Sequence, residues 1–351
     1  MRAGVDDVAV VIPTYKATRT ILSVLDRIGP EAKCIYVVDD CCPDRTGNLV
    51  AANCTDPRVR VIQCSKNLGV GGATMMGYRA AIADGALIIV KIDSDGQMDP
   101  SLIPFFAAPI ISGEADYTKG NRFFNAASLV EMPRLRILGN AGLSFLTKLS
   151  TGYWRTFDPT NGYTAIHSRV AALLPFEQVS SRFFFESDML YFLSLLRAVV
   201  VDIPIMSRYA DEESNLKARS VILQFFWAHL LRFVRRVSLN YFLRDFSFGS
   251  ICILFGSPLL LFGTTFGMAN WLINWHRGMA TPTGTIMLCA ICVLLGIQFI
   301  LFFLAADIAS VPDRTLHPSL RTRPIQPLRQ FVSACTASTE AAATETQDQL
   351  E

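Results

Sequence analysis

Three oxygen-bearing side chains have the types and spacing of a divalent-cation site. Asp93, Asp95 and Gln97 alternate with small residues directly after the apolar run Leu87–Ile92. Carboxylates this close repel each other unless a cation lies between them, and hard oxygen ligands suit Mg²⁺ or Mn²⁺. One Asp-x-Asp pair is weak evidence, because about one is expected by chance in such a chain. Its position at the end of an apolar run favours a metal site.

Polar residues also follow three earlier apolar runs. The groups are Pro13-Thr14-Tyr15, Asp39-Asp40, and Asn67 with Gly69, Gly71 and Gly72. Two groups have simpler explanations, since the aspartates could be turn residues and the glycines could start a helix. The glycines do not follow the first run, which counts against a dinucleotide-binding fingerprint.

The apolar runs themselves predict buried strands that would position these clusters. The expected strands are Val8–Ile12, Cys34–Val38, Val59–Gln63 and Leu87–Ile92. Their alternation with helical stretches predicts an α/β domain with a mostly parallel sheet. Parallel strands end at one edge of the sheet, where such domains bind ligands. The four polar clusters therefore predict a nucleotide crevice.

Composition points to a membrane part and away from nucleic acid. Of the 351 residues, 51% are hydrophobic and 18% are charged, against roughly 25% charged in soluble globular chains. The net charge is only +2, which leaves no excess for bulk nucleic-acid binding.

Two apolar runs, 248–268 and 286–306, lack charged side chains. At 1.5 Å per residue, each would span about 32 Å of a hydrocarbon core roughly 30 Å thick. They predict a transmembrane hairpin, with two buried helices of a soluble protein as the alternative. Trp271 and Trp275 in the predicted connection suit an interfacial belt.

Arginines flank the hairpin but are scarce inside it. The connection carries Arg277, whereas the flanks carry Arg232, Arg235, Arg236, Arg244, Arg314, Arg321, Arg323 and Arg329. The positive-inside rule then predicts a multi-pass protein of the cell inner (plasma) membrane, with both termini and the first domain in the cytoplasm. The hairpins could also support a homo-oligomer.

These features predict four segments. Residues 1–213 form the cytoplasmic catalytic domain, and 214–247 form basic amphipathic helices on the anionic leaflet. Packing helices of the first domain are the alternative for 214–247. Residues 248–306 form the hairpin, and 307–351 form a cytoplasmic tail, partly disordered, with little apolar content near its end.

The motifs together resemble those of the family-2 glycosyltransferases. They are V-V-I-P-T-Y, V-V-D-D, N-x-G-x-G-x-A and I-D-S-D-G-Q-M-D-P, in this order. The chain is most similar to the polyprenol-phosphate branch, which includes dolichol-phosphate-mannose synthases with a C-terminal membrane hairpin. This resemblance implies a Rossmann-like GT-A domain.

The resemblance also implies roles for residues at matching positions. The donor would be bound by Pro13, Tyr15, Asp39, Asp40, Asn67 and Gly71, and the metal would be held by Asp93, Asp95 and Gln97. The acceptor phosphate would face Arg122, Arg134 and Arg136. Arg208 would clamp the donor diphosphate and would be catalytic together with Asp93 and Asp95. There are departures: Lys16 and Ala17 replace the usual Asn-Glu, and Gly162-Tyr163-Thr164 lacks the usual arginine.

Glu186 and Asp188 form a second acidic pair. In many relatives an acidic residue in this region is the base that activates a sugar hydroxyl. Capping of the helix that follows is the alternative.

The expected function is an inverting, metal-dependent transfer of a sugar from a UDP- or GDP-linked donor to a polyprenyl phosphate. This reaction would serve cell-envelope glycan or glycolipid synthesis. One alternative is a glycosyltransferase that extends a lipid-linked sugar, and another is an inactive membrane scaffold that binds nucleotide-sugar.

Overall fold

The computed structural model describes residues 7–124, 134–206 and 218–321. The chain divides into two compact units. Met1–Ala228 and Pro312–Glu351 form the sheet unit, and His229–Val311 form the hairpin unit. Each unit is described by itself.

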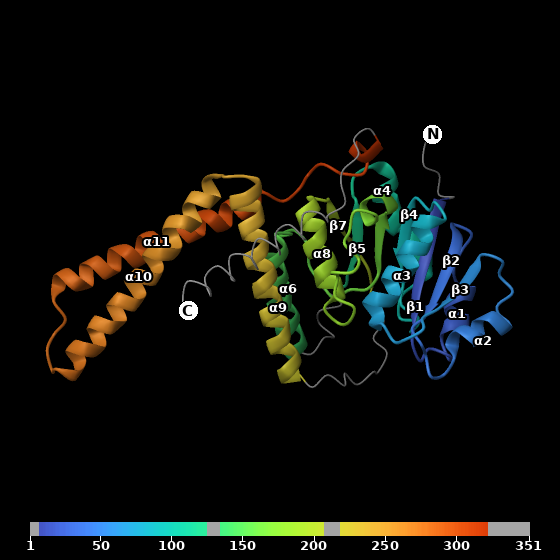
Figure 1. The fold of residues 1–351 in the computed structure, drawn as a ribbon, viewed down its shortest axis with the longest axis horizontal. Coiled ribbons are helices and arrows are strands. Elements are labelled where there is room, and N and C mark those ends of the chain that lie inside the picture. Colours follow the sequence, from blue (N-terminus) through green and yellow to red (C-terminus); the bar gives the residue numbers. More distant parts are fainter. Residues whose placement is uncertain (1–6, 125–133, 207–217, 322–351) are drawn as a thin grey trace, which may run out of the picture. The chain divides into compact units, whose positions relative to one another are not determined.

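The described part of the sheet unit contains a seven-stranded sheet in the order β3-β2-β1-β4-β6-β5-β7 (Figure 1). The strands are β1 (Val8–Thr14), β2 (Ala32–Asp39), β3 (Val59–Gln63), β4 (Ile88–Lys91), β5 (Tyr117–Asn121), β6 (Thr164–His167) and β7 (Val200–Pro204). The first four strands pair in parallel, β6 is antiparallel to both of its neighbours, and β5 pairs in parallel with β7. The mostly parallel sheet confirms the expected fold class, although β1 and β2 extend beyond their predicted ends. The prediction that Val59–Gln63 is a buried strand is wrong, because β3 is the edge strand and its side chains are exposed or only partly buried.

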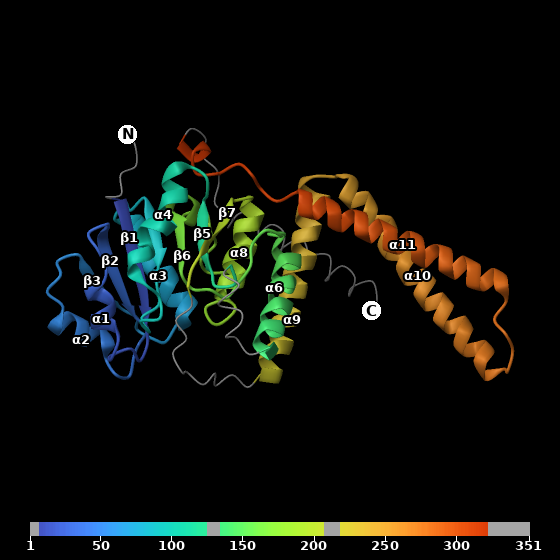
Figure 2. The ribbon, with the colours of Figure 1, turned by 180° about the vertical axis from the view of Figure 1, so that it is seen from behind.

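Helices flank this sheet (Figures 1 and 2). They are α1 (Ile21–Asp26), α2 (Thr46–Asn53), α3 (Gly69–Ala83), α4 (Ile103–Ser112), α6 (Arg134–Thr151), α7 (Ser168–Ala171) and α8 (Phe185–Leu196), with a short turn η2 (Pro100–Leu102) before α4. Helix α6 lies beside α8 rather than against the strands (Figures 1 and 2). Ile88 and Val90 of β4 pack in the main core with α1 and α4. Because strand side chains alternate between faces, Lys91 must project from the opposite face.

The hairpin unit is built from two long antiparallel helices, α10 (Phe248–His276) and α11 (Thr283–Ala309). Both are long and apolar enough to cross a membrane, judged by length and composition. Each extends beyond the run that predicted it, so Trp271 and Trp275 lie on α10 and not in the connection. Helix α10 continues past this run because no Gly or Pro occurs between Ala269 and Arg277, and it ends before Gly278, which adopts a left-handed φ of +63°.

The amphipathic segment before the hairpin forms α9 (Ala218–Ser238) and a short turn η3 (Leu239–Arg244). Arg236 on α9 makes a buried bidentate ion pair with Asp307 on α11, at 2.7 and 3.0 Å. The Tyr241 hydroxyl donates to the same carboxylate at 2.7 Å. These contacts fix the end of α9 to the hairpin.

The chain after the hairpin returns to the sheet unit. The backbone N–H groups of Leu316 and His317 donate to the buried carboxylate of Asp116. The His317 ring lies 2.7 Å from Asp116 Oδ1 through Nδ1 and stacks on His167 with ring centroids 4.4 Å apart. We call Thr315–His317 the return segment. Part of the predicted tail is therefore ordered, while 322–351 lie outside the described residues.

Candidate active site

The first two strands end beside each other at the predicted crevice edge. Pro13 is level with Val38, and Thr14 is level with Asp39. Tyr15 follows β1 with 48% of its surface exposed, so its ring is open to a ligand. Both predicted donor residues of this segment, Pro13 and Tyr15, therefore lie at the carboxyl edge.

The two aspartates after β2 organise the loops of this edge. Asp39 accepts hydrogen bonds from the backbone N–H groups of Cys42 and Gly47, at 2.7 and 2.6 Å. Asp40 accepts from the N–H groups of Leu68 and Gly69. Both side chains are buried. Their direct contacts are therefore with the protein backbone.

The glycine motif forms the start of helix α3. Asn67 donates to the backbone oxygen of Asp40 at 3.2 Å, which joins this turn to the end of β2. The N–H of Gly71 donates to the backbone oxygen of Ser181 at 2.9 Å. The motif thus packs α3 against the 180–185 loop, as the helix-start interpretation expects.

Asp93, Asp95 and Gln97 lie together in the turn after β4. The N–H of Gln97 donates to Asp95 Oδ1 at 2.9 Å, and Thr20 anchors the turn by donating to the backbone oxygen of Ser94 at 2.6 Å. Asp95 is exposed, whereas Asp93 is half-buried with 31% of its side chain accessible.

This donor set fits a divalent cation that completes its coordination with substrate oxygens and water. Within the described residues, no group of three or more His, Cys, Asp or Glu side chains could hold a metal alone. Mg²⁺ commonly uses one or two carboxylates together with substrate phosphates. Two carboxylates and one carboxamide on a single turn meet that requirement.

A buried lysine that was not among the predicted site residues lies beneath Asp93. Lys91, the last residue of β4, is 1% exposed, and its Nζ lies 2.8 Å from Asp93 Oδ1 and 3.7 Å from Glu186 Oε1. Desolvation lowers the pKa of Lys91, but the charges of Asp93 and Glu186 outweigh it and the net pKa is raised. The lysine therefore remains an ammonium. A lysine inside an apolar strand, two residues before a carboxylate, was the sequence signal for it.

The acidic pair on α8 separates into two roles. Glu186 faces Lys91 with 15% of its side chain exposed, and burial raises its pKa although Lys91 opposes the shift. Asp188 is fully buried and accepts from the N–H of Ser180 at 2.9 Å. Asp188 therefore fastens the 180–185 loop, and Glu186 is the member that faces the site. Neither caps α8, whose N-cap residue Phe184 has no side-chain capping bond, so the capping alternative is wrong.

Of the three predicted acceptor arginines, the structure describes the side chain of Arg122. Arg122 forms a forked contact with Asp158, from Nε at 2.7 Å and Nη2 at 2.8 Å. Arg134 and Arg136 begin α6, but their side chains are not among those described. Arg208 lies outside the described residues. The acceptor and diphosphate roles of these arginines remain predictions.

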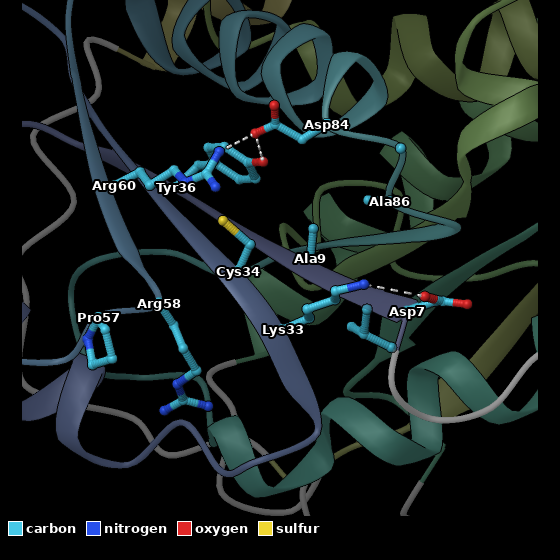
Figure 3. A pocket seen from close by; sticks show the side chains of 12 residues that line it. Asp7, Ala9, Lys33, Cys34, Tyr36, Pro57, Arg58, Arg60, Asp84 and Ala86 are labelled. Carbon is cyan, nitrogen blue, oxygen red and sulfur yellow. Dashed lines mark hydrogen bonds and ion pairs between the residues drawn. The ribbon is translucent and has the colours of Figure 1, made fainter.

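A cavity of about 170 Å³ lies at the opposite edge of the sheet, where β1, β2 and β3 begin (Figure 3). Its charged side chains are all paired: Lys33 with Asp7, Arg60 with Asp84, and Arg58 with Asp56, which does not itself line the cavity. The Tyr36 hydroxyl also donates to Asp84. This cavity does not include any predicted site residue.

Comparisons with known proteins agree with this geometry. The family model described as "Glycosyl transferase family 2" matches residues 9–173. UDP-N-acetylglucosamine–dolichyl-phosphate N-acetylglucosaminyltransferase of Methanococcus voltae is 29% identical over 229 residues, which is 61% of this chain and 90% of that protein. Undecaprenyl-phosphate mannosyltransferase of Micrococcus luteus is 28% identical over 203 residues, 56% of this chain and 82% of that protein.

A solved structure shares the fold. Glucosyl-3-phosphoglycerate synthase from Mycobacterium tuberculosis, in complex with UDP, aligns with a TM-score of 0.50 at 20% identity, covering 65% of this chain and 80% of that one. The region matched by the family model, residues 9–173, contains β1 to β4 and the Asp93 turn. Residues 9–173 therefore form a family-2 glycosyltransferase domain, and the relatives support its polyprenol-phosphate branch.

Proposed function

We propose that this protein is a membrane-bound inverting glycosyltransferase that moves a sugar from a UDP- or GDP-linked donor to a polyprenyl phosphate. The observation that carries the proposal is the Asp93 turn, which presents two carboxylates and Gln97 at the carboxyl edge of a family-2 sheet. The relatives from Methanococcus voltae and Micrococcus luteus are named for dolichyl-phosphate and undecaprenyl-phosphate acceptors.

The acceptor can act as its own nucleophile. The second pKa of a phosphate monoester is about 6, so the lipid phosphate is largely dianionic at neutral pH. The protein must then align two anionic reactants and stabilise the charge on the leaving nucleotide. One in-line displacement inverts the anomeric carbon.

Asp93, Asp95 and Gln97 would hold the divalent cation, Mg²⁺ or Mn²⁺, which supplies charge compensation to the donor diphosphate. Tyr15 offers an open surface to the nucleoside at the same edge, next to the buried Pro13. Arg208 is proposed for the diphosphate, and Arg122, Arg134 and Arg136 for the acceptor phosphate.

The hairpin would bring this chemistry to the lipid. Helices α10 and α11 are long and apolar enough for a bilayer, and the arginines on their flanks favour a cytoplasmic location for both ends. Reporter fusions at Arg277 and after Arg323 test this topology. A reporter at Arg277 that lies in the cytoplasm would contradict it.

A second function is extension of a lipid-linked sugar, and the position of Glu186 favours it. A sugar hydroxyl needs a general base, and Glu186 is a carboxylate beside Asp93 whose pKa is raised by burial. With a phosphate acceptor, the same carboxylate would not be needed as a base.

A donor and acceptor panel tests both functions. Purified full chain receives Mn²⁺, labelled UDP- or GDP-sugars, and either undecaprenyl phosphate or a glycosylated lipid carrier. We expect product from undecaprenyl phosphate, loss of turnover in EDTA, and recovery with Mn²⁺ or Mg²⁺. Product from the glycosylated carrier alone would establish the second function instead, and binding of nucleotide-sugar without any product would favour an inactive scaffold.

A further inference from the structure

The buried ammonium of Lys91 has no role in the function proposed above. It lies at the end of β4, on the sheet face opposite α1 and α4. Two acidic side chains from different elements flank it: Asp93 from the turn after β4, and Glu186 from the first turn of α8. The Lys91 ammonium thus connects the Asp93 turn to α8, the helix that carries the candidate base Glu186.

The contact between Lys91 and its partners is electrostatic. Lys91 Nζ lies 2.8 Å from Asp93 Oδ1 and 3.7 Å from Glu186 Oε1. Even a paired ammonium is costly to bury, because its desolvation offsets much of the gain from the ion pairs. Packing alone does not account for a charged residue here, because an apolar side chain would fill the same space without that cost.

The backbone at Gly162 closes the other side of this ion pair. A β-carbon built on Gly162 would lie 2.5 Å from Asp93 Oδ2 and 2.6 Å from Lys91 Nζ, closer than real β-carbons approach such atoms. The loop before β6 can therefore cover Asp93 and Lys91 because residue 162 has no side chain. The ring of Phe185 adds a further contact, 5.9 Å from Nζ to the ring centroid.

We propose that Lys91 is a positioning residue, which holds the carboxylates of Asp93 and Glu186 in one arrangement before substrates bind. Without the ammonium, two acidic side chains in a partly dry site would repel each other and turn apart. With it, Asp93 keeps Oδ1 on Lys91, while 31% of its side chain stays accessible to a ligand. The positioning role of Lys91 rests on the proposed function only in the test that measures sugar transfer; the unfolding and nucleotide-binding tests do not depend on it.

A double-mutant cycle tests this coupling without using activity. Lys91→Met keeps the length of the side chain and removes the charge, so we expect the Tm of the full chain to fall by about 5 °C or more. Glu186→Gln alone should also lower the Tm, because it removes one partner of Lys91. In the double variant the loss should be less than half of the sum of the two single losses. Additive losses would mean that Lys91 only fills space.

Nucleotide binding gives a second readout. Binding of UDP and of GDP to the full chain is measured by calorimetry with Mn²⁺ present. If Lys91 positions Asp93, Lys91→Met should weaken the metal-dependent binding of the preferred nucleotide at least fivefold. Tighter binding would show that Lys91 competes with the cation for Asp93, which would overturn the proposal. If Lys91→Met does not fold, the double variant must recover folded protein, and its failure to do so would also overturn the proposal.

Turnover completes the test. At saturating substrates we expect Lys91→Met to lower kcat at least tenfold. Lys119→Met, a change at another buried lysine of the same sheet, should lower the Tm but leave kcat per folded molecule within about threefold. Equal effects on kcat would reduce Lys91 to a structural role. If the unchanged protein transfers no sugar to undecaprenyl phosphate, the proposed function fails, while the unfolding cycle and the nucleotide binding still decide the role of Lys91.

Discussion

Lys91 on β4 and Lys119 on β5 are buried lysines on either side of the same residue. Both are level with Thr164 of β6, which lies between their strands. Lys119 donates to the backbone oxygens of Phe157 and Gly120 and lies 3.3 Å from Asp202 Oδ1. Lys91 instead lies between two carboxylates, with Nζ 2.8 Å from Asp93 Oδ1 and 3.7 Å from Glu186 Oε1.

Their electrostatics differ in the same way. Desolvation lowers the pKa of Lys119, and Asp202 and Asp158 offset this only in part. The pKa of Lys91 is raised, because Asp93 and Glu186 outweigh its desolvation. The other oxygen of the Asp202 carboxylate, Oδ2, accepts hydrogen bonds from the Asn121 side chain and from the N–H of Phe157.

The comparison separates two kinds of buried charge. The Lys119 cluster is closed, since its groups find their partners within the protein, as in a cluster that maintains structure. The Lys91 cluster is open, since Asp93 is still accessible and continues into the exposed Asp95 turn. Changes in the open cluster should therefore affect turnover most, and changes in the closed cluster should affect stability most.

The largest effect is expected in the open cluster. Asp95→Asn keeps the shape of the turn and removes one charge from the cation site, so turnover should fall on the order of 10³-fold. The fold should survive, because this exposed carboxylate contributes little to the core. Turnover and thermal unfolding are measured on the same preparation. A well-folded variant with near-normal, EDTA-resistant turnover would refute the metal-dependent mechanism.

A change in the closed cluster should mainly lower the stability of the fold. Lys119→Met leaves the carboxylate of Asp202 buried without its cation, and we expect a loss of about 3 kcal/mol in the free energy of unfolding. Denaturant titration measures this loss. Adding Asp202→Asn should recover part of it. No recovery in the double variant would mean that the two side chains are not coupled.

Two glycines provide a matched pair of smaller effects. Gly162→Ala should place its β-carbon against Asp93 and Lys91, lowering turnover at least tenfold at a stability cost of about 2 kcal/mol. Gly120→Ala meets Ile205 and Asn161 at 2.8 and 2.9 Å, so it should cost similar stability. Its turnover per folded molecule should stay closer to that of the unchanged protein. Equal losses of turnover would remove the distinction between the clusters.

The smallest effect concerns Asp158 at the border of the closed cluster. Burial raises its pKa, but the forked contact from Arg122 outweighs this and the net pKa is lowered. A carboxyl whose folded pKa lies below its unfolded value of about 3.9 stabilises the fold above that pH, and the gain is lost as pH falls through the folded pKa. The stability gap between the unchanged protein and Asp158→Asn, about 1 kcal/mol at pH 6.5, should shrink below pH 4. A gap that stays constant would exclude the ionic contact.

The positions of the first four strands and of the Asp93 turn could be predicted because they depend on local patterns, whereas β5, β6 and β7 were not predicted. Apolar runs of five or six residues indicate buried strands, and polar residues at their ends must meet at one edge of a parallel sheet. The long apolar runs predicted α10 and α11 for the same reason. The helix ends were less predictable, because α10 continues through polar residues without a breaker.

The partners of single side chains depend on contacts between distant segments. Residues 186 and 188 lie about 200° apart around a helix, so only one of them can face the site, and their order along the chain does not say which. The contact between Arg122 and Asp158 joins residues 36 positions apart, and no local pattern predicted it. Lys91 lay within a run that was interpreted only for its apolar character.

The return segment has a consequence for the order in which the protein is made. Asp116 is fully buried and receives its partners Leu316 and His317 from a part of the chain that follows α11. A ribosome releases those residues only after both hairpin helices have been synthesised. The sheet unit therefore emerges with a buried carboxylate that lacks its last hydrogen-bond donors, and its folding can be completed only after the hairpin exists.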